Sequence, residues 1–395
     1  MSADATPVRK PSAVWAFALV PIALLGVLIA YLVITGGGLR ELSGPPVEQV
    51  KVTRVTLPSE GLVRLQVVND GPQSVTISQV LVDDAFWAFT ASPSTNVPRF
   101  GRVTIDVPYP WVEGDAHHLQ LLSSIGTVFK AEIPVAQRTP QPNRDLFWQF
   151  GLVGLYVGLI PIALGMLWYP WMRHLNANAI NFILSLTVGL LIFLAIGTWL
   201  DALEFAAELP AFWQGVPAVA LVALLSFGVL LALGTRRNGE EPSPLGVSTR
   251  IAVGIGLHNL GEGLAIGAAF ALGEAALGTF LILGFTLHNI TEGVGIAAPL
   301  VKKNPGWRAF VLLALIAGGP AIFGTWLGGF AFNPVLATVF LAVGVGAIAQ
   351  VVWEVGGMVV RASRHAGLPN ATWLNLAGVT AGVVIMYVTA FLVKF

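Results

Sequence analysis

The chain has 395 residues, of which 55% are hydrophobic and only 11% are charged. Soluble domains carry about 25% charged residues, so this composition excludes a soluble globular protein, a disordered chain and a nucleic-acid-binding protein. Lys and Arg balance Asp and Glu at 21 each, so the net charge indicates no polyanionic partner. The absence of Cys excludes disulfides, thiolate metal ligands and cysteine nucleophiles. The composition is that of a polytopic helical membrane protein with an additional part.

Residues 1–42 form a short polar head followed by one apolar run. Arg9 and Lys10 precede the run, which extends from Ser12 to Thr35 and is closed by Gly36–Gly38. The apolar region of a cleaved signal peptide usually has only about 7–15 residues. The longer run here favours an uncleaved signal-anchor transmembrane helix over a cleaved signal peptide.

Residues 43–140 have a different composition, with Pro, Gly, Asp and Arg among alternating apolar residues. Val63–Asp84 is typical of two strands joined by an Asn-Asp-Gly-Pro turn. Arg102–Val107 and Thr127–Val135 are predicted as further strands, and no helical period of 3.6 is present. Several short strands at this spacing predict a small Ig-like β-sandwich domain.

Residues 146–395 are almost wholly apolar with short breaks. A membrane-spanning helix needs about 20 mostly apolar residues, and the segment divides into eight such spans. With the first helix they make nine. The eight are Leu146–Trp171, Asn178–Ala206, Phe212–Gly234, Ile251–Leu272, Leu277–Val301, Ala309–Phe330, Pro334–Val360 and Trp373–Val393.

The charges in the connecting loops predict the orientation in the membrane. Cytoplasmic loops carry an excess of Lys and Arg, and every second loop here is basic while the alternate loops carry acids. We therefore expect a multi-pass protein of the plasma or inner membrane with a cytoplasmic N-terminus. The β domain and the C-terminus are then extracytoplasmic, and a cytoplasmic loop at 235–249 separates three spans from five. The basic residues are Arg173, His174, Arg236, Arg237, Lys302, Lys303, Arg308, Arg361 and Arg364, and the acids are Asp201, Glu204, Glu208 and Glu274.

Two consecutive spans carry the same pattern of polar residues, His-Asn-x-x-Glu-Gly. It occurs at His258–Gly263 in the fourth of the eight spans and at His288–Gly293 in the fifth. Ionisable side chains in the bilayer core cost about 2.5–3.5 kcal/mol on insertion scales, so they are few and usually functional. His and Glu four residues apart lie on one helix face, and both patterns fall near the middle of their spans.

Antiparallel packing of these spans is expected to place His258 level with Glu292, and Glu262 near His288. Two imidazoles and two carboxylates then converge with two amide oxygens, a ligand set suited to Zn²⁺, Fe²⁺, Mn²⁺ or Cd²⁺. The Gly after each Glu allows close helix approach. The alternative is that the two patterns are buried His–Glu hydrogen-bonded pairs that only hold the helices together.

At these residues the chain resembles the ZIP (Zrt/Irt-like protein) family of divalent metal transporters. The resemblance covers about Leu146 to Phe395 and rests on eight spans, the paired motifs on the fourth and fifth, and the loop after the third. It implies an eight-helix transport bundle, a homodimer, and passage of metal from outside to the cytoplasm. It also implies that the first, fourth, fifth and sixth spans move relative to the other four.

The resemblance implies specific ligands as well. His258, Glu262, His288 and Glu292 would be primary ligands, and Asn259 and Asn289 would serve an adjacent second site. Many members of the family carry a Glu in the sixth span, where Ala321 stands here, so a full two-metal site is in question. No His cluster is present in the loop at 235–249, which argues against metal capture there.

Several residues are weaker candidates. Glu354 lies inside the seventh span and is a candidate metal ligand for receiving the released ion, with pairing to a polar neighbour as the alternative. The other candidates are two acids at the outer end of the second span that attract cations, two adjacent His in the β domain that collect metal, and one Met that adds a thioether ligand. The alternatives are solvation at a helix end for the acids, a surface turn for the two His, and packing for the Met. These candidates are Asp201 and Glu204, His117 and His118, and Met166.

Two other functions compete with transport. An intramembrane zinc-dependent hydrolase would need a base to activate water, but the His-Glu-x-x-His pattern of metalloproteases is absent and no span besides the fourth and fifth contains His. A metal sensor would need an output domain, and the inner loops are short. We therefore expect a transporter and no enzyme, with a divalent metal ion, zinc first, as cargo, no resident cofactor, and the lipid bilayer and a second copy as partners.

Overall fold

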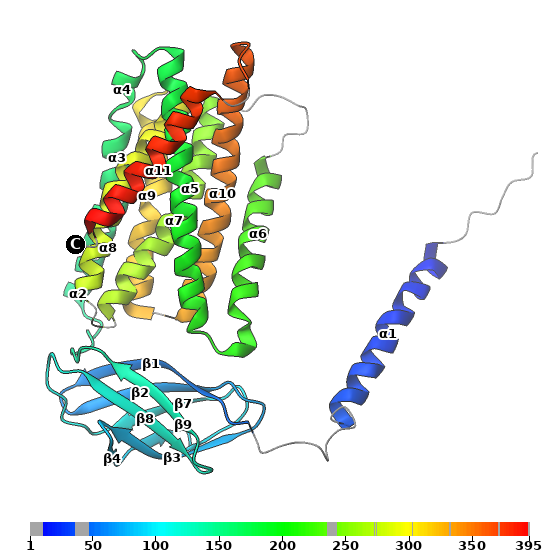
Figure 1. Cartoon of the computed structure of the whole chain (residues 1–395), viewed down its shortest axis with the longest axis vertical. Coiled ribbons are helices and arrows are strands. Elements are labelled where there is room, and N and C mark those ends of the chain that lie inside the picture. The colour runs from blue at the N-terminus through cyan, green and yellow to red at the C-terminus, as the bar shows by residue number, and fades with distance from the viewer. Residues whose placement is uncertain are drawn as a thin grey trace, which may run out of the picture. The chain divides into compact units, whose positions relative to one another are not determined.

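Figure 1 shows a computed structural model of the chain. The structure describes residues 11–35, 47–234, 243–271, 273, 275–301, 303–331, 333–369 and 372–393. The predicted polar head, the Gly36–Gly38 linker, residues 235–242 of the predicted loop, Glu274 and Lys302 lie outside the described residues. The chain divides into two compact units, Met1–Glu48 and Gln49–Phe395.

The first unit contains one described element, helix α1 (Pro11–Thr35). It has 25 residues, and the described large apolar side chains between Leu19 and Ile34 are exposed. Its length and apolar surface agree with the predicted signal-anchor helix, since a span needs about 20 residues.

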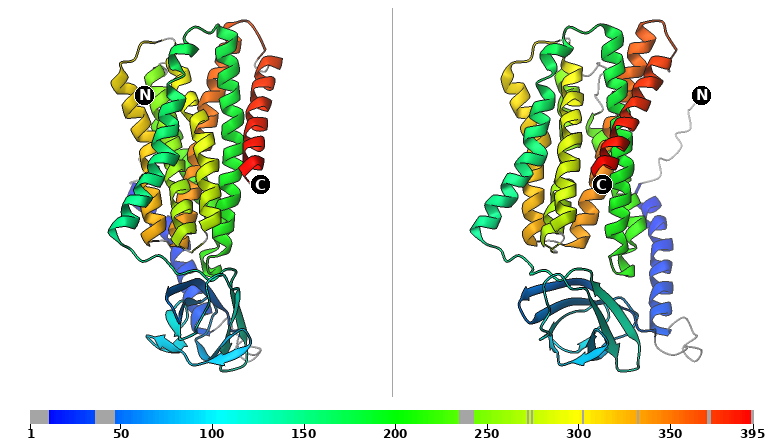
Figure 2. Two further views of the ribbon diagram at one scale, coloured as in Figure 1. Left: turned by 90° about the vertical axis from the view of Figure 1, so that its left-hand side faces the viewer. Right: turned by 60° about the vertical axis from the view of Figure 1, so that its left-hand side comes forward.

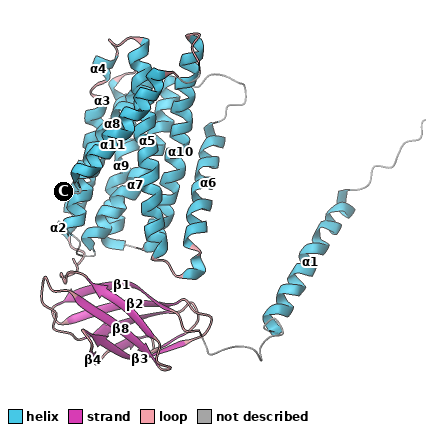
Figure 3. Cartoon of the chain, viewed as in Figure 1, coloured by secondary structure: helices cyan, strands magenta, loops and turns pink. Residues whose placement is uncertain are grey.

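The second unit begins with nine strands, coloured magenta in Figure 3, which form two antiparallel sheets. One sheet has the order β1-β2-β7-β5, and the other has the order β4-β3-β8-β9 with β6 paired to β3. The strands are β1 (Val50–Ser59), β2 (Leu62–Asn69), β3 (Val75–Val82), β4 (Ala85–Trp87), β5 (Thr90–Ser92), β6 (Asn96–Val97), β7 (Arg102–Val107), β8 (His117–Ser123) and β9 (Val128–Ile133).

The two sheets share one apolar core, as in a small β-sandwich. Alternate residues of each long strand enter it, for example Leu65 of β2, Ile105 of β7, Ile77 of β3 and Leu121 of β8, all at most 1% exposed. This alternation follows from the two-residue period of a strand. The three predicted segments correspond to four observed strands. Val63–Asp84 corresponds to β2 and β3, Arg102–Val107 to β7, and Thr127–Val135 to β9.

The remaining elements are helices, and eight spans among the described residues are long and apolar enough to cross a membrane, as predicted. Figure 2 shows them running side by side as a bundle. The first span consists of α2 (Arg144–Gly154), a π-helical turn η3 (Leu155–Leu159), α3 (Ile160–Met166) and α4 (Tyr169–Met172). The others are α5 (Ala177–Ala207), α6 (Gly215–Gly234) after the 3₁₀ turn η4 (Ala211–Trp213), α7 (Pro244–Ala271), α8 (Ala275–Ala297) ending in the 3₁₀ turn η5 (Ala298–Leu300), α9 (Trp307–Ala331), α10 (Pro334–His365) and α11 (Trp373–Val393).

Glycines bring the backbones of certain spans into direct contact. A Cβ at Gly158 of the first span would meet the carbonyl oxygen of Gly318 in α9, and one at Gly293 of α8 would meet that of Ile162 in the first span. Similar contacts tie α7 to α9, so the first, fourth, fifth and sixth spans form one group held backbone to backbone. Such close approach is the usual role of small residues between membrane helices.

The other four spans form a second group in the same way. A Cβ at Gly189 of α5 would meet the carbonyl oxygen of Val379 in α11, and one at Gly346 of α10 would meet that of Ala223 in α6. Where α7 faces α10, between the groups, the nearest atoms to Gly261 and Gly254 belong to the side chains of Leu341 and Val351, whereas a Cβ at Gly344 of α10 would lie 3.3 Å from the Cα of His258. The backbones are therefore closest within each group.

Candidate metal centre

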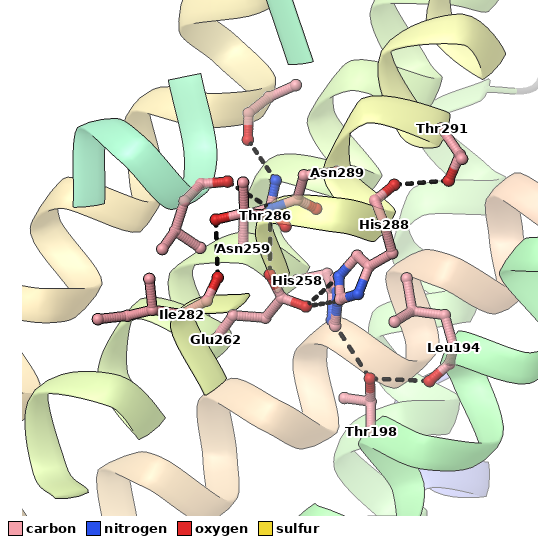
Figure 4. Close-up of polar contacts among 12 residues, drawn as sticks. Leu194, Thr198, His258, Asn259, Glu262, Ile282, Thr286, His288, Asn289 and Thr291 are labelled. Carbon is pink, nitrogen blue, oxygen red and sulfur yellow. Dashed lines mark hydrogen bonds and ion pairs between the residues drawn. The ribbon is translucent and has the colours of Figure 1, made fainter. Parts of the chain in front are cut away.

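The two His-Asn-x-x-Glu-Gly motifs lie on the adjacent helices α7 and α8 and face each other (Figure 4). At a rise of about 1.5 Å per residue, His258 lies roughly 20 Å from either end of α7, so the motif is central in its span. All six polar side chains of the motifs are buried, with His288 the most exposed at 7%. The predicted convergence at mid-span is therefore present in the structure.

Glu262 is the centre of the cluster. Its Oε1 lies 2.8 Å from Nε2 of His258, one turn away on the same helix. The same oxygen lies 2.6 Å from Nε2 of His288 on the neighbouring helix α8. The ligand atoms of these three residues all lie within 4.8 Å of one another, close enough to share one metal ion. The predicted proximity of Glu262 to His288 is confirmed.

Both asparagines are held by backbone carbonyls of other spans. Asn259 Nδ2 donates to the carbonyl oxygen of Ala317 in α9 at 3.0 Å, and Asn289 Nδ2 donates to that of Val157 at 2.9 Å. These bonds fix the orientation of each amide. Among the described residues, neither Asn Oδ1 has a hydrogen-bond partner, so both amide oxygens are available as ligands.

The carbonyl of Val157 is available because of the residue four positions later. In a regular α-helix that carbonyl would accept from the N–H of residue 161, which is Pro161 and has none. The chain passes through the π-helical turn at this point, a feature often found at functional sites. Asn289 therefore donates to a carbonyl that the N–H missing from Pro161 cannot serve.

Glu292 is the one ionisable residue of the two motifs that is not in the group formed by His258, Glu262 and His288. Its side chain is 5% exposed, yet within the described part of the chain neither carboxylate oxygen has a hydrogen-bond partner. A buried carboxylate without a partner is costly and normally coordinates a cation or pairs with one. This observation argues against the two motifs serving only as hydrogen-bonded pairs between helices, because such pairs would satisfy Glu292 as they satisfy Glu262.

Sequence reasoning missed Thr198 of α5. Its Oγ1 donates to the carbonyl of Leu194 at 2.9 Å and lies 3.3 Å from Nδ1 of His258, the ring nitrogen that faces away from Glu262. A contact on the second nitrogen orients a metal-binding imidazole. No signal in the sequence singled it out, because α5 contains two further buried hydroxyl residues, Ser185 and Thr187.

The glycines after the two glutamates have the predicted role. A Cβ at Gly263 would meet the carbonyl oxygen of Ala321, and one at Gly293 would meet that of Ile162. Ala321 of α9 is fully buried against α7. The residue therefore contributes to the packing of α7 against α9.

The acidic candidates Glu354, Asp201 and Glu204 are not in the group formed by His258, Glu262 and His288. Glu354 forms an ion pair with Arg250 of α7 and accepts from Gln350 at 3.0 Å, which matches the alternative of pairing with a polar neighbour. Met166 is packed in the bundle core, and Asp201 and Glu204 are exposed at the end of α5.

The expectation that His117 and His118 lie on a surface turn is wrong. They begin strand β8, where alternation buries one and exposes the other. His117 is 5% exposed with Nδ1 2.8 Å from Asp83, whereas the His118 side chain is exposed.

No protein-family model matches the chain, and no curated protein matches it either.

Proposed function

We propose that this protein transports divalent metal cations across a membrane, with the motifs on α7 and α8 as the transport site. The proposal rests chiefly on Glu292, a buried carboxylate of the second motif whose two oxygens have no hydrogen-bond partner among the described residues. His258, Glu262 and His288 form a group that could hold an ion, and the amide oxygens of Asn259 and Asn289 are buried without a partner in the described part of the chain. We also propose that the eight-span part belongs with the ZIP transporters that its motifs resemble.

The donor set suits a cation such as Zn²⁺. In this account the ion binds to Nε2 of His258, Nε2 of His288 and Oε1 of Glu262, the atoms that pair with one another in the structure. Glu292 supplies the second negative charge. Two carboxylates neutralise one divalent ion, which lowers the cost of moving it through hydrocarbon. Imidazole and carboxylate ligands favour Zn²⁺ over Fe²⁺ and Mn²⁺ on intrinsic affinity, so zinc is the first candidate.

Transport further requires that the site open to each side in turn. The buried cluster has to be exposed by a movement of spans, and the two groups of helices held backbone to backbone are natural rigid bodies for it. In this account the first, fourth, fifth and sixth spans move against the rest, and the fourth and fifth carry the six ligands. They part at the surface between α7 and α10, where the glycine contacts are looser than those within each group.

The proposed orientation rests on the loop charges, with the basic loops in the cytoplasm and the β domain and C-terminus outside. The proposed inward movement of the metal rests on the resemblance alone. A homodimer in the cell membrane is part of the same proposal.

Accumulation of metal by cells that express the chain tests this function, because neither a hydrolase nor a sensor predicts it. Wild type should raise cellular zinc above that of cells with an empty vector, and Glu292→Gln should abolish the increase at equal expression. Glu132→Gln is the matched control, since it is the same substitution on an exposed strand residue outside the bundle. Equal accumulation by wild type and Glu292→Gln would contradict the assignment.

A further inference from the structure

A cavity of about 350 Å³ lies between the β1-β2-β7-β5 sheet and one end of the helical bundle. The sheet contributes mainly polar residues from all four strands. The bundle contributes the turn after α5, η4 and the start of α10. The metal ligands described above are not among its lining residues, so the cavity is separate from the transport site.

The sheet side of the cavity is a polar row that crosses the strands. Arg54 of β1 pairs in register with Gln66 of β2, Gln66 pairs with Thr104 of β7, and Thr104 pairs with Ser92 of β5. Residues opposite one another in neighbouring strands share a face, so this row faces away from the apolar core. A register shift between Val52 and Arg54 marks a bulge, which re-aims side chains locally.

Two guanidinium groups in this cavity lack a counter-ion. Neither Arg54 nor Arg102 takes part in an ion pair among the described residues, and the Arg54 Nε is buried without a hydrogen-bond partner. Burial lowers the pKa of Arg54, which is the signature of a cation removed from water without compensation. An anion in the cavity would supply that compensation.

The other cations on this face of the sheet already have partners. Arg64 forms a two-bond pair with Asp106, at 2.7 Å for each bond, and Lys51 donates to the carbonyls of Ala207 and Leu209 at the end of α5. Glu208 also lines the cavity and has an interaction of its own. Two guanidiniums against one carboxylate leave the cavity with an excess positive charge.

The bundle side adds a second feature that attracts anions. Asn333 caps α10, a helix of 32 residues, and Asn333, Pro334 and Val335 all line the cavity. The N-terminus of a helix carries a partial positive charge. Trp213 lines the cavity too, and Trp is typical of the level where spans meet the lipid headgroups.

We propose that this cavity binds a phosphate group, that of an anionic phospholipid headgroup or a free phosphate ion. Arg54 and Arg102 hold the phosphate oxygens, because guanidinium donors match phosphate geometry. The polar row and the start of α10 complete the site. The volume suits a headgroup, and the position at the ends of the spans places the cavity where such a group lies.

Calorimetric titration of the purified full chain in neutral detergent tests the site with three probes. These are short-chain phosphatidylglycerol, short-chain phosphatidylcholine and inorganic phosphate. We expect saturable binding of phosphatidylglycerol, at least tenfold tighter than that of phosphatidylcholine. Binding of inorganic phosphate with equal affinity would identify the free anion as the ligand, and no phosphate binding would identify the lipid headgroup; both results support the phosphate site.

Variants then assign the binding to the two arginines. Arg54→Gln with Arg102→Gln should weaken it at least tenfold, and Arg102→Gln alone, at an exposed residue, should weaken it measurably without affecting the fold. Arg64→Gln is the control, with the same loss of charge on the same face outside the cavity. Absence of binding by any probe, unchanged binding in the double variant, or an equal loss in Arg64→Gln would overturn the proposal.

Discussion

Substitution of Gly263 by Ala tests whether the contact between α7 and α9 holds the site together. The added Cβ would lie against the carbonyl oxygen of Ala321, with the carbonyl carbon of Ala321 and the backbone nitrogen of Thr325 both at 3.0 Å. Ordinary contacts between such atoms are about 3.5–4.0 Å, and the carbonyl oxygen lies closer than the other two atoms, so the helices must part by about 1 Å or more. The displaced segment of α7 includes Glu262, the residue before.

The expected cost follows from the same geometry. Overpacking of this kind typically destabilises a protein by about 1–3 kcal/mol. A shift of Glu262 by several tenths of an ångström lengthens its contacts with both imidazoles, and a loss of about 1.4 kcal/mol in ion binding corresponds to a tenfold weaker affinity. We expect Gly263→Ala to lower the unfolding temperature and to weaken Zn²⁺ binding at least tenfold, measured by thermal unfolding and calorimetry.

Gly319→Ala is the matched control on α9. No atom lies within 4 Å of a Cβ at Gly319, so the substitution adds the same methyl group without a clash. Replacing a helical Gly by Ala stabilises a helix by up to about 1 kcal/mol. If Gly263→Ala behaved like Gly319→Ala in both measurements, the argument that close backbone contact positions the site would be refuted.

Three further predictions concern individual side chains. Arg250→Gln should destabilise the protein by about 1–3 kcal/mol in thermal unfolding, because it leaves the Glu354 carboxylate without its cation, and adding Glu354→Gln should restore most of the loss. Thr198→Val should weaken Zn²⁺ binding about tenfold at unchanged expression, because the contact that orients His258 is lost; unchanged affinity would show that Thr198 has no positioning role. Burial alone would raise the pKa of Asp83, but hydrogen bonds from the His118 N–H, His117 and Tyr109 outweigh it and hold that pKa below its usual range. The stability that Asp83 contributes is therefore present above the usual Asp pKa of about 3.9 and is lost as the pH falls through the lower pKa of the folded state. Asp83→Asn should therefore flatten the loss of stability between about pH 5 and pH 2, measured by unfolding at a series of pH values. An unaltered loss of stability over that range would contradict this.

The helical part of the fold and the convergence of the motifs could be predicted because their signals are local and strong. An apolar run of about 20 residues has one stable conformation in a membrane, and the 3.6-residue period places His258 and Glu262 on one face of α7. The repeat of the motif on the next span then fixed which helices face each other. Of the strands, β7 was predicted at its observed bounds because its apolar residues alternate without interruption.

What the sequence did not reveal depends on contacts between distant segments. Thr198 reaches His258 only because α5 packs beside α7, and the free carbonyl of Val157 becomes a partner only because α8 brings Asn289 to it. Strands β1, β4, β5, β6 and β8 were missed. The burial of His117 in β8 was missed as well, since a buried His beside Asp83 has no local signature. The pairing of Glu354 with Arg250 likewise joins residues 104 positions apart.

Uptake of metal into proteoliposomes of purified protein tests the central claim most directly. Zn²⁺, Cd²⁺, Fe²⁺, Mn²⁺ and Mg²⁺ would be presented to wild type and to a variant with His258→Ala and His288→Ala. We expect wild type to take up Zn²⁺ and to exclude Mg²⁺, which prefers oxygen ligands, and the double variant to take up neither. Failure of wild type to move any of these ions, or equal uptake by the double variant, would contradict the account.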